Sequence, residues 1–396
     1  MLEQEGFCLT MPSDSARSTR WITGRFLKKL ARDLFSLPAE LYGDDLSSVR
    51  ETLFNRLRSL GKDGVLSIVR RPQVHSFLCC ATSSLIGRNV PGARARSREL
   101  LFQLAFEMSL DGTLNEDVLW DAPFPLENLV SPTHRKSLSW DSSVDSLRFK
   151  CSDIVSSGGA LGWVDSNFPA LGERFVLALA DSNPMSDFEA HPDKDGNQLS
   201  LGSSPVDGWT DSLSASLSVI ADSLPGIFRE MSLIHQQFIP VGTDDERHLS
   251  ASYQESIGTI YLTLHPQEMT MTEAVIHEFQ HNKINMLFHI DTVMENAFYP
   301  LFSSPVRPDP RPLHGVLLAA HAFVPVAELY RRLVLSESEL CRQRGFSDRF
   351  RHIVTSNSAA LDVLVENAKP TRLGQAVIDE MVELNEVHRS FVKEQL

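Results

Sequence analysis

One stretch in the second half of the chain, TMTEAVIHEFQHNKINMLFHID (270–291), constrains the fold most strongly. Its apolar residues recur at spacings of three and four, which is typical of the buried face of a helix. Thr270 and Glu273 match the S/T-x-x-E capping box, so we expect the helix to begin there. Upstream, SIGTIYLTLH (256–265) is β-branched and bounded by turn residues, which predicts a strand. The sequence therefore predicts a strand that leads directly into a long helix.

Two histidines on this helix are placed to share a metal ion. His277 and His281 lie four residues apart, so at about 100° per residue they are separated by roughly 40° around the axis. Glu278 lies at the edge of the same face and can reach a metal-bound water or oxygen ligand. Lys283 is about 200° around the helix from His281 and is expected to face away. The HExxH pattern is used by zinc peptidases, but imidazoles suit iron as well as zinc.

A catalytic metal usually needs a third protein ligand, and the next apolar stretch, HGVLLAAHAFVPVAELY (314–330), offers candidates on a second helix. His321 is the first choice, because an imidazole inside so apolar a helix costs free energy unless it is satisfied. The alternatives are His314, His289 and Glu328. The tripeptides HPD (191–193) and HID (289–291) also match the H-x-D of facial-triad iron enzymes, but the chain has too few strands for the β-barrel that carries that motif.

Composition narrows the classes of partner and compartment. The chain has 37 Lys+Arg against 51 Asp+Glu, or 37 − 51 = −14, so it lacks the broad basic surface that nucleic-acid binding uses. No apolar run approaches the roughly 18–20 residues of a membrane span. The N-terminus carries acids where a signal peptide has a basic patch. Five scattered cysteines without CxxC spacing are expected to be reduced thiols. We therefore expect a cytoplasmic protein with no membrane or nucleic-acid partner.

The character of the sequence changes from about residue 160. Residues 1–155 are expected to form a mainly helical region, and the stretch 113–160, which is richer in Ser, Pro and Asp, is expected to be connecting structure. Residues 156–396 are expected to form a metal-binding catalytic domain with a small sheet and the HExxH helix at 270–290. The predicted fold class is α+β, predominantly helical. Helices are expected in 21–37, 46–62, 97–112, 212–235 (interrupted at Pro225) and 315–334, and further strands in 173–184 and 238–242.

Several segments together resemble one known family. HEFQHNK (277–283) followed by RPDPRPLHG (307–315) is similar to the HExxH proteins of peptide-modification gene clusters, which are regarded as α-ketoglutarate-dependent peptide β-hydroxylases. The segments 180–202 and 248–266 resemble the middle region of that family. The resemblance covers about residues 180–335. It departs from the family after DPRP, where Leu317-Leu318-Ala319-Ala320 stands in place of LLHG or LLQG.

The resemblance implies a zincin-like catalytic half that hydroxylates a side chain of a ribosomally made precursor peptide with Fe(II) and α-ketoglutarate. By position, His277 and His281 match the iron ligands and Glu278 the acid of the motif. The distal carboxylate of α-ketoglutarate needs a cation, preferably a guanidinium. Arg307 and Arg311 flank the DPRP turn and are the candidates. The N-terminal helical region is a candidate for peptide binding.

Two other functions stay open at this point. In a zinc metallopeptidase, Glu278 would be the general base that activates zinc-bound water. In a hydroxylase no such base is required, and Glu278 would orient a ligand instead. A non-catalytic maturation or scaffold protein would carry a structural or degenerate metal site.

Overall fold

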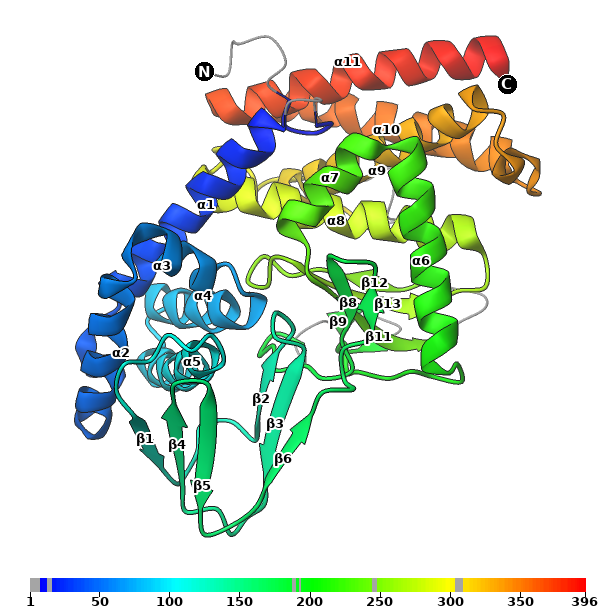
Figure 1. Cartoon of the computed structure of the whole chain (residues 1–396). Helices are drawn as coiled ribbons and strands as arrows, with labels where there is room; N and C mark the ends of the chain where they lie inside the picture. The colour runs from blue at the N-terminus through cyan, green and yellow to red at the C-terminus, as the bar shows by residue number, and fades with distance from the viewer. Residues whose placement is uncertain (1–7, 13–15, 187–189, 192–193, 244–247, 303–308) are drawn as a thin grey trace.

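The computed structural model describes residues 8–12, 16–186, 190–191, 194–243, 248–302 and 309–396 (Figure 1). The predicted α+β class with a predominance of helix is confirmed. The first part of the chain is a group of packed helices. The buried face of α1 repeats at every fourth residue through Ile22, Phe26, Leu30 and Leu34. These helices are α1 (Arg17–Ser36), α2 (Ser47–Ser59), α3 (Gly61–Val69), α4 (Pro72–Ile86) and α5 (Val90–Leu110), with short 3₁₀ turns at Ala39–Leu41 and Asp44–Leu46.

The next part of the chain corrects the prediction of helical and connecting structure up to residue 155. Residues 118–164 form two three-stranded antiparallel sheets, ordered β1-β4-β5 and β2-β3-β6. Buried and exposed residues alternate along β1 and β4, which is the two-residue period of a half-buried strand. The strands are β1 (Val118–Asp121), β2 (Asn128–Ser131), β3 (Lys136–Trp140), β4 (Ser146–Lys150), β5 (Asp153–Ser157) and β6 (Leu161–Val164).

A five-stranded sheet lies at the centre of the second half, in the order β12-β13-β11-β8-β7. Its three inner strands are parallel, and its two edge strands run antiparallel to them. Phe238 and Ile260 are register partners and pack into the main core with the helices, whereas Ile239 and Tyr261 face a smaller cluster on the other side. The strands are β7 (Ala170–Leu171), β8 (Phe175–Leu177), β11 (Gln237–Thr243), β12 (Ser250–Ala251) and β13 (Thr259–Leu264); β9 (Ala190–His191) and β10 (Lys194–Asp195) form a separate pair.

Long helices cover the sheet and build the rest of the molecule (Figure 1). The predicted break at Pro225 is confirmed, since α6 (Val206–Ser223) ends there and α7 (Pro225–Ile234) begins. A small hairpin, β14 (Leu301–Phe302) with β15 (Arg311–Pro312), lies between α8 (Glu268–Ile290) and α9 (Leu313–Leu335). The chain then continues through a 3₁₀ turn at Glu339–Arg342, α10 (Phe346–Asn367) and α11 (Arg372–Gln395).

The start of α8 differs from the expected capping box. Gln267 is the N-cap residue and makes no side-chain cap, so α8 begins two residues before Thr270. Glu273 does not turn back to the helix start, because its carboxylate accepts hydrogen bonds from Tyr330 on α9 and Arg349 on α10. The capping-box prediction is therefore wrong: partners on other helices take the glutamate.

Helix α9 is the exception to the expectation that no segment is long and apolar enough to span a membrane. By length and composition it passes that test, with a mean hydropathy of 1.4 over its most apolar window. However, 72% of that window is buried inside the protein, where α9 packs against α8 and α10. This is the burial of a core helix.

Candidate metal centre

The two motif histidines face each other from consecutive turns of α8. Their Nε2 atoms are 2.9 Å apart, and the rings meet edge to face with centroids 4.4 Å apart. One carboxylate oxygen of Glu278 lies 4.0 Å from Nε2 of His277. Ligand atoms of these three residues all lie within 4.8 Å of one another, and no other such cluster of His, Cys, Asp and Glu occurs in the described part of the chain. The structure thus places side by side the three residues that the helical spacing predicts to share one face of α8.

The surroundings of the pair keep both imidazoles neutral. Burial lowers the pKa of His277 well below its usual value, and His281 and Arg349 lower it further. Burial, followed by the effect of His314, lowers the pKa of His281 to about 4. The Nδ1 atoms of His277 and His281 are buried and have no hydrogen-bond partner among the described residues. Neutral imidazoles offer a lone pair to a metal, so the two Nε2 atoms would suit as ligands of one divalent cation.

Glu278 is held by the edge strand of the central sheet. The hydroxyl of Ser250 donates to one carboxylate oxygen at 2.7 Å, and the hydroxyl of Ser252 donates to the other at 2.8 Å. The carboxylate is almost fully buried. Its orientation beside the histidine pair is therefore fixed from β12 and the residue that follows that strand. Sequence reasoning missed these serines because a strand of two residues gives no periodic signal.

A second set of side chains closes the site from α9 and α10. The ring of Phe323 lies 4.6 Å from that of His277, and the Arg349 guanidinium lies 5.8 Å from the Phe323 ring. Arg349 also forms a two-pronged ion pair with Glu273, at 2.7 and 3.2 Å. Phe323 thus packs against one side of the His277 ring, and the His277 side chain stays 21% exposed. Sequence reasoning did not single out either residue, because only the packing of three helices brings them to the motif.

His321 is not brought into this cluster. Its ring is fully buried, and burial followed by the charge of Lys283 lowers its pKa to about 3, while the backbone of Leu9 and Gln280 partly opposes this shift. Lys283 in turn bonds Glu230 and the Thr10 carbonyl, both at 2.9 Å. Lys283 is thus engaged by α7 and the N-terminal segment, as expected for a residue turned away from the pair, and His281 as well as Lys283 lowers the pKa of His321.

The three alternative third ligands also lie outside the cluster. His314, at the start of α9, lies between the rings of Phe288 and Phe298, with centroids 4.5 and 5.1 Å away. Its effect on His281 is to lower the pKa of that imidazole. His289 accepts or donates a hydrogen bond at the Gln254 carbonyl. Glu328 is engaged by Arg331, Arg332 and His388.

Of the two candidate arginines for a ligand carboxylate, only Arg311 can be described. Its Nε lies 2.9 Å from the Asp309 carboxylate, and its side chain is 41% exposed. The chain of Arg311 passes close to Gly315, since a Cβ on that glycine would lie 3.7 Å from the Arg311 Cβ. Arg311 thus lies against the first turn of α9. Arg307 lies outside the described residues.

Comparison with protein-family models finds no family that matches the chain, and a search of curated proteins finds no significant match.

Proposed function

We propose that this protein is a non-haem Fe(II) and α-ketoglutarate-dependent enzyme that hydroxylates the β-carbon of a side chain in a ribosomally made precursor peptide. One observation carries the proposal: two neutral imidazoles face each other at 2.9 Å beside a buried carboxylate that two serines hold in place. Histidine imidazoles are metal donors in non-haem Fe(II) oxygenases, and a fixed carboxylate beside them can orient the other ligands of the metal.

The zincin-like architecture is part of the same proposal. The HExxH helix α8 packs beside a small sheet, and the antiparallel edge strand β12 contacts the glutamate of the motif. A second helix, α9, covers the histidines with Phe323. This arrangement supports a catalytic half built from a small sheet, a motif helix and a closing helix.

Each residue has a role that needs no hydrolytic base. His277 and His281 would hold Fe(II) through Nε2, and Glu278 would orient oxygen ligands from a fixed position. Arg311 would bind the distal carboxylate of α-ketoglutarate in exchange for its present partner, Asp309. When bound, Fe(II) with α-ketoglutarate and O₂ supplies the oxidation, in which one oxygen atom enters the peptide C–H bond and the other enters succinate as CO₂ is released.

A zinc metallopeptidase is the second candidate, and the HExxH motif itself favours it. In that mechanism Glu278 must take a proton from metal-bound water. Here both of its oxygens already accept hydrogen bonds from Ser250 and Ser252, which suits an orienting carboxylate better than a mobile base. We therefore favour hydroxylation.

We also propose a cytoplasmic location, because the five cysteines are free thiols.

Peptide products distinguish the candidates directly. The purified protein would be incubated with a synthetic peptide library under air, either with Fe(II) and α-ketoglutarate or with Zn(II) alone, and the products analysed by mass spectrometry. The proposal predicts peptides heavier by one oxygen atom, only with Fe(II) and α-ketoglutarate, together with succinate. Shorter fragments with Zn(II) alone would show a peptidase, and no product under either condition with a loaded metal would favour a scaffold protein.

A further inference from the structure

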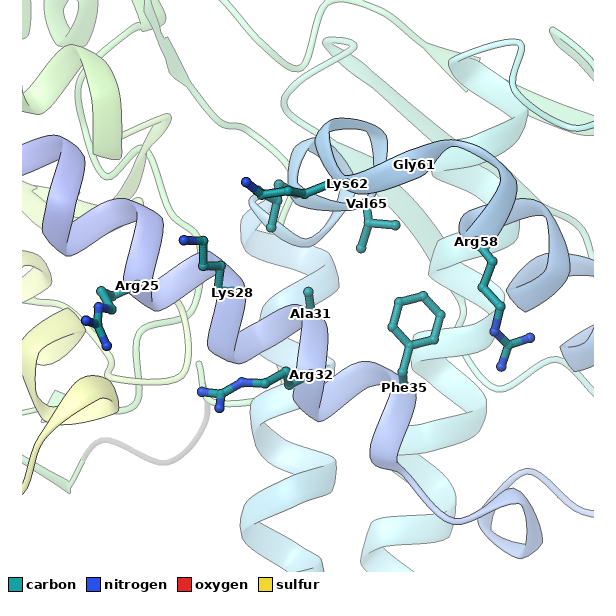
Figure 2. Close-up of a pocket in the computed structure, with 10 residues that line it drawn as sticks. Arg25, Lys28, Ala31, Arg32, Phe35, Arg58, Gly61, Lys62 and Val65 are labelled. Carbon is teal, nitrogen blue, oxygen red and sulfur yellow. The ribbon is translucent and has the colours of Figure 1, made fainter.

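An open groove of about 720 Å³ lies between α1 and α3 in the N-terminal region (Figure 2). It is distinct from the metal centre, because all of its lining residues come from α1, α2 and α3. Figure 2 shows the side chains of Phe35 and Val65 projecting into the space between the two helices. Its lining combines an apolar floor with a cationic rim.

The floor is made of small and apolar side chains. Ala31 and Phe35 lie one turn apart on α1, and Val65 and Leu66 lie opposite them on α3. Phe35 packs edge to face on Phe54, with centroids 5.7 Å apart, so its ring is fixed in position. Such a floor gains free energy when an apolar side chain covers it.

The rim carries five cations and no carboxylate: Arg25, Lys28, Arg32, Arg58 and Lys62. All five are exposed, and no salt bridge engages any of them within the described residues. Two of them have other contacts: Arg25 lies over the Trp21 ring, while Arg58 lies over Phe35 and donates to Asn55. Five cations on one groove stand out in a chain whose net charge is −14.

We propose that this groove binds an acidic, amphipathic segment of the peptide substrate, with apolar side chains on the floor and carboxylates on the cationic rim. Charge complementarity selects an acidic partner. A long polyphosphate chain, such as a nucleic acid, would extend beyond the groove, where the acidic protein of net charge −14 repels it. The assignment of the segment to the substrate rests on the proposed function; the acidic specificity of the groove does not.

The position of α1 connects the groove to the metal centre. The opposite face of α1 packs against α8, where the Phe26 ring lies 5.2 Å from that of His289. A peptide bound in the groove is therefore tethered to the body that carries the histidine pair. Tethering raises the effective concentration of the rest of the peptide at the reacting centre.

Fluorescence anisotropy with the full-length protein tests the groove. The probe is a labelled synthetic helical peptide of about four turns, with leucines along one face and glutamates on both flanks. We expect it to bind, and we expect a peptide with Lys in place of Glu, or a polyglutamate without leucines, to bind at least about tenfold more weakly. The double variant Lys28→Glu/Arg32→Glu should weaken the binding of the acidic probe by about tenfold or more, and high salt should weaken it in the wild type.

A matched control carries the same change in net charge elsewhere. Arg344→Glu/Lys393→Glu reverses two exposed cations on other parts of the chain and should bind the probe within about twofold of wild type. Equal loss in both double variants, equal binding of polyglutamate, or displacement of the probe by a DNA oligonucleotide at lower concentration than by unlabelled probe would overturn the proposal. The assay needs no iron, so His277→Ala/His281→Ala should bind the probe normally even if hydroxylation proves wrong.

Discussion

The two motif histidines owe their chemistry to desolvation. Burial holds His277 and His281 neutral, so no proton would have to leave their imidazoles before they bind a cation. The double variant His277→Ala/His281→Ala should therefore lower the metal content of protein reconstituted with Fe(II) or Zn(II) from about one ion per chain to near zero. Elemental analysis after desalting measures this. The exposed-histidine variant His352→Ala should keep its metal, and equal loss in that control would point to surface binding.

The hydrogen bonds from Ser250 and Ser252 to the Glu278 carboxylate can be tested by removing both hydroxyls. In Ser250→Ala/Ser252→Ala the buried carboxylate loses both hydroxyl donors, at a cost of about 1–3 kcal/mol in the free energy of unfolding. Urea denaturation measures that loss, and the turnover of the metal-loaded protein should fall as well. A matched change at Ser139 and Ser143, which lie outside the site, should cost much less. Unchanged stability in the first variant would mean that these hydrogen bonds do not hold the carboxylate.

The sequence predicts the histidine pair but not the side chains that surround it, because the two depend on different interactions. His277 and His281 are related by helix geometry alone, which four residues of sequence determine. Ser252, Phe323 and Arg349 reach the motif only through the packing of separate elements, which local sequence does not encode. His321 was chosen because its neighbours in the sequence are apolar, but burial of an imidazole does not by itself bring its nitrogens to the histidine pair.

Among the elements, α8 depends on a buried ion pair. Lys283 is fully buried and pairs with Glu230 of α7 at 2.9 Å, and the Thr19 hydroxyl of α1 donates to the same carboxylate at 2.7 Å. Removing one partner leaves a buried charge without compensation. We expect Lys283→Met and Glu230→Leu each to cost about 3–5 kcal/mol of unfolding free energy, and the double variant to cost much less than their sum. Urea denaturation of the four proteins measures the coupling; additive losses would contradict it.

Elements with a strong periodic signal were predictable, and short ones were not. The apolar repeat located α8 and α9 to within a few residues, and β-branched runs located β11 and β13. The six strands in 118–164 are only four or five residues long, and Ser, Asp and Lys at many of their positions resemble loop composition. The available signal for strands was the two-residue spacing of buried apolar residues, Val118 and Trp120 in β1 and Leu147 and Phe149 in β4.

The whole molecule should be sensitive to acid. Burial lowers the pKa of both His75 and His235 to about 3, so each is neutral in the folded protein at pH values where the unfolded chain binds a proton. Stability is therefore complete above about pH 6.5 and is lost as the pH falls towards about 3. In His235→Phe, one proton fewer is taken up on unfolding, so the dependence of unfolding free energy on pH should become shallower by up to about 1.4 kcal/mol per pH unit. Urea denaturation at several pH values measures the slope, and an unchanged slope would show that His235 is not buried as a neutral group.

The central claim is that His277 and His281 hold an Fe(II) ion that α-ketoglutarate chelates, and anaerobic visible spectroscopy tests it most directly. Chelation of Fe(II) by a 2-oxo acid gives a metal-to-ligand charge-transfer band, so no peptide substrate is needed. Addition of α-ketoglutarate to the Fe(II)-loaded protein should produce this band, with saturation at one equivalent per metal, and His277→Ala/His281→Ala should not show it. An Fe(II)-loaded wild-type protein that shows no band at saturating α-ketoglutarate would contradict the account.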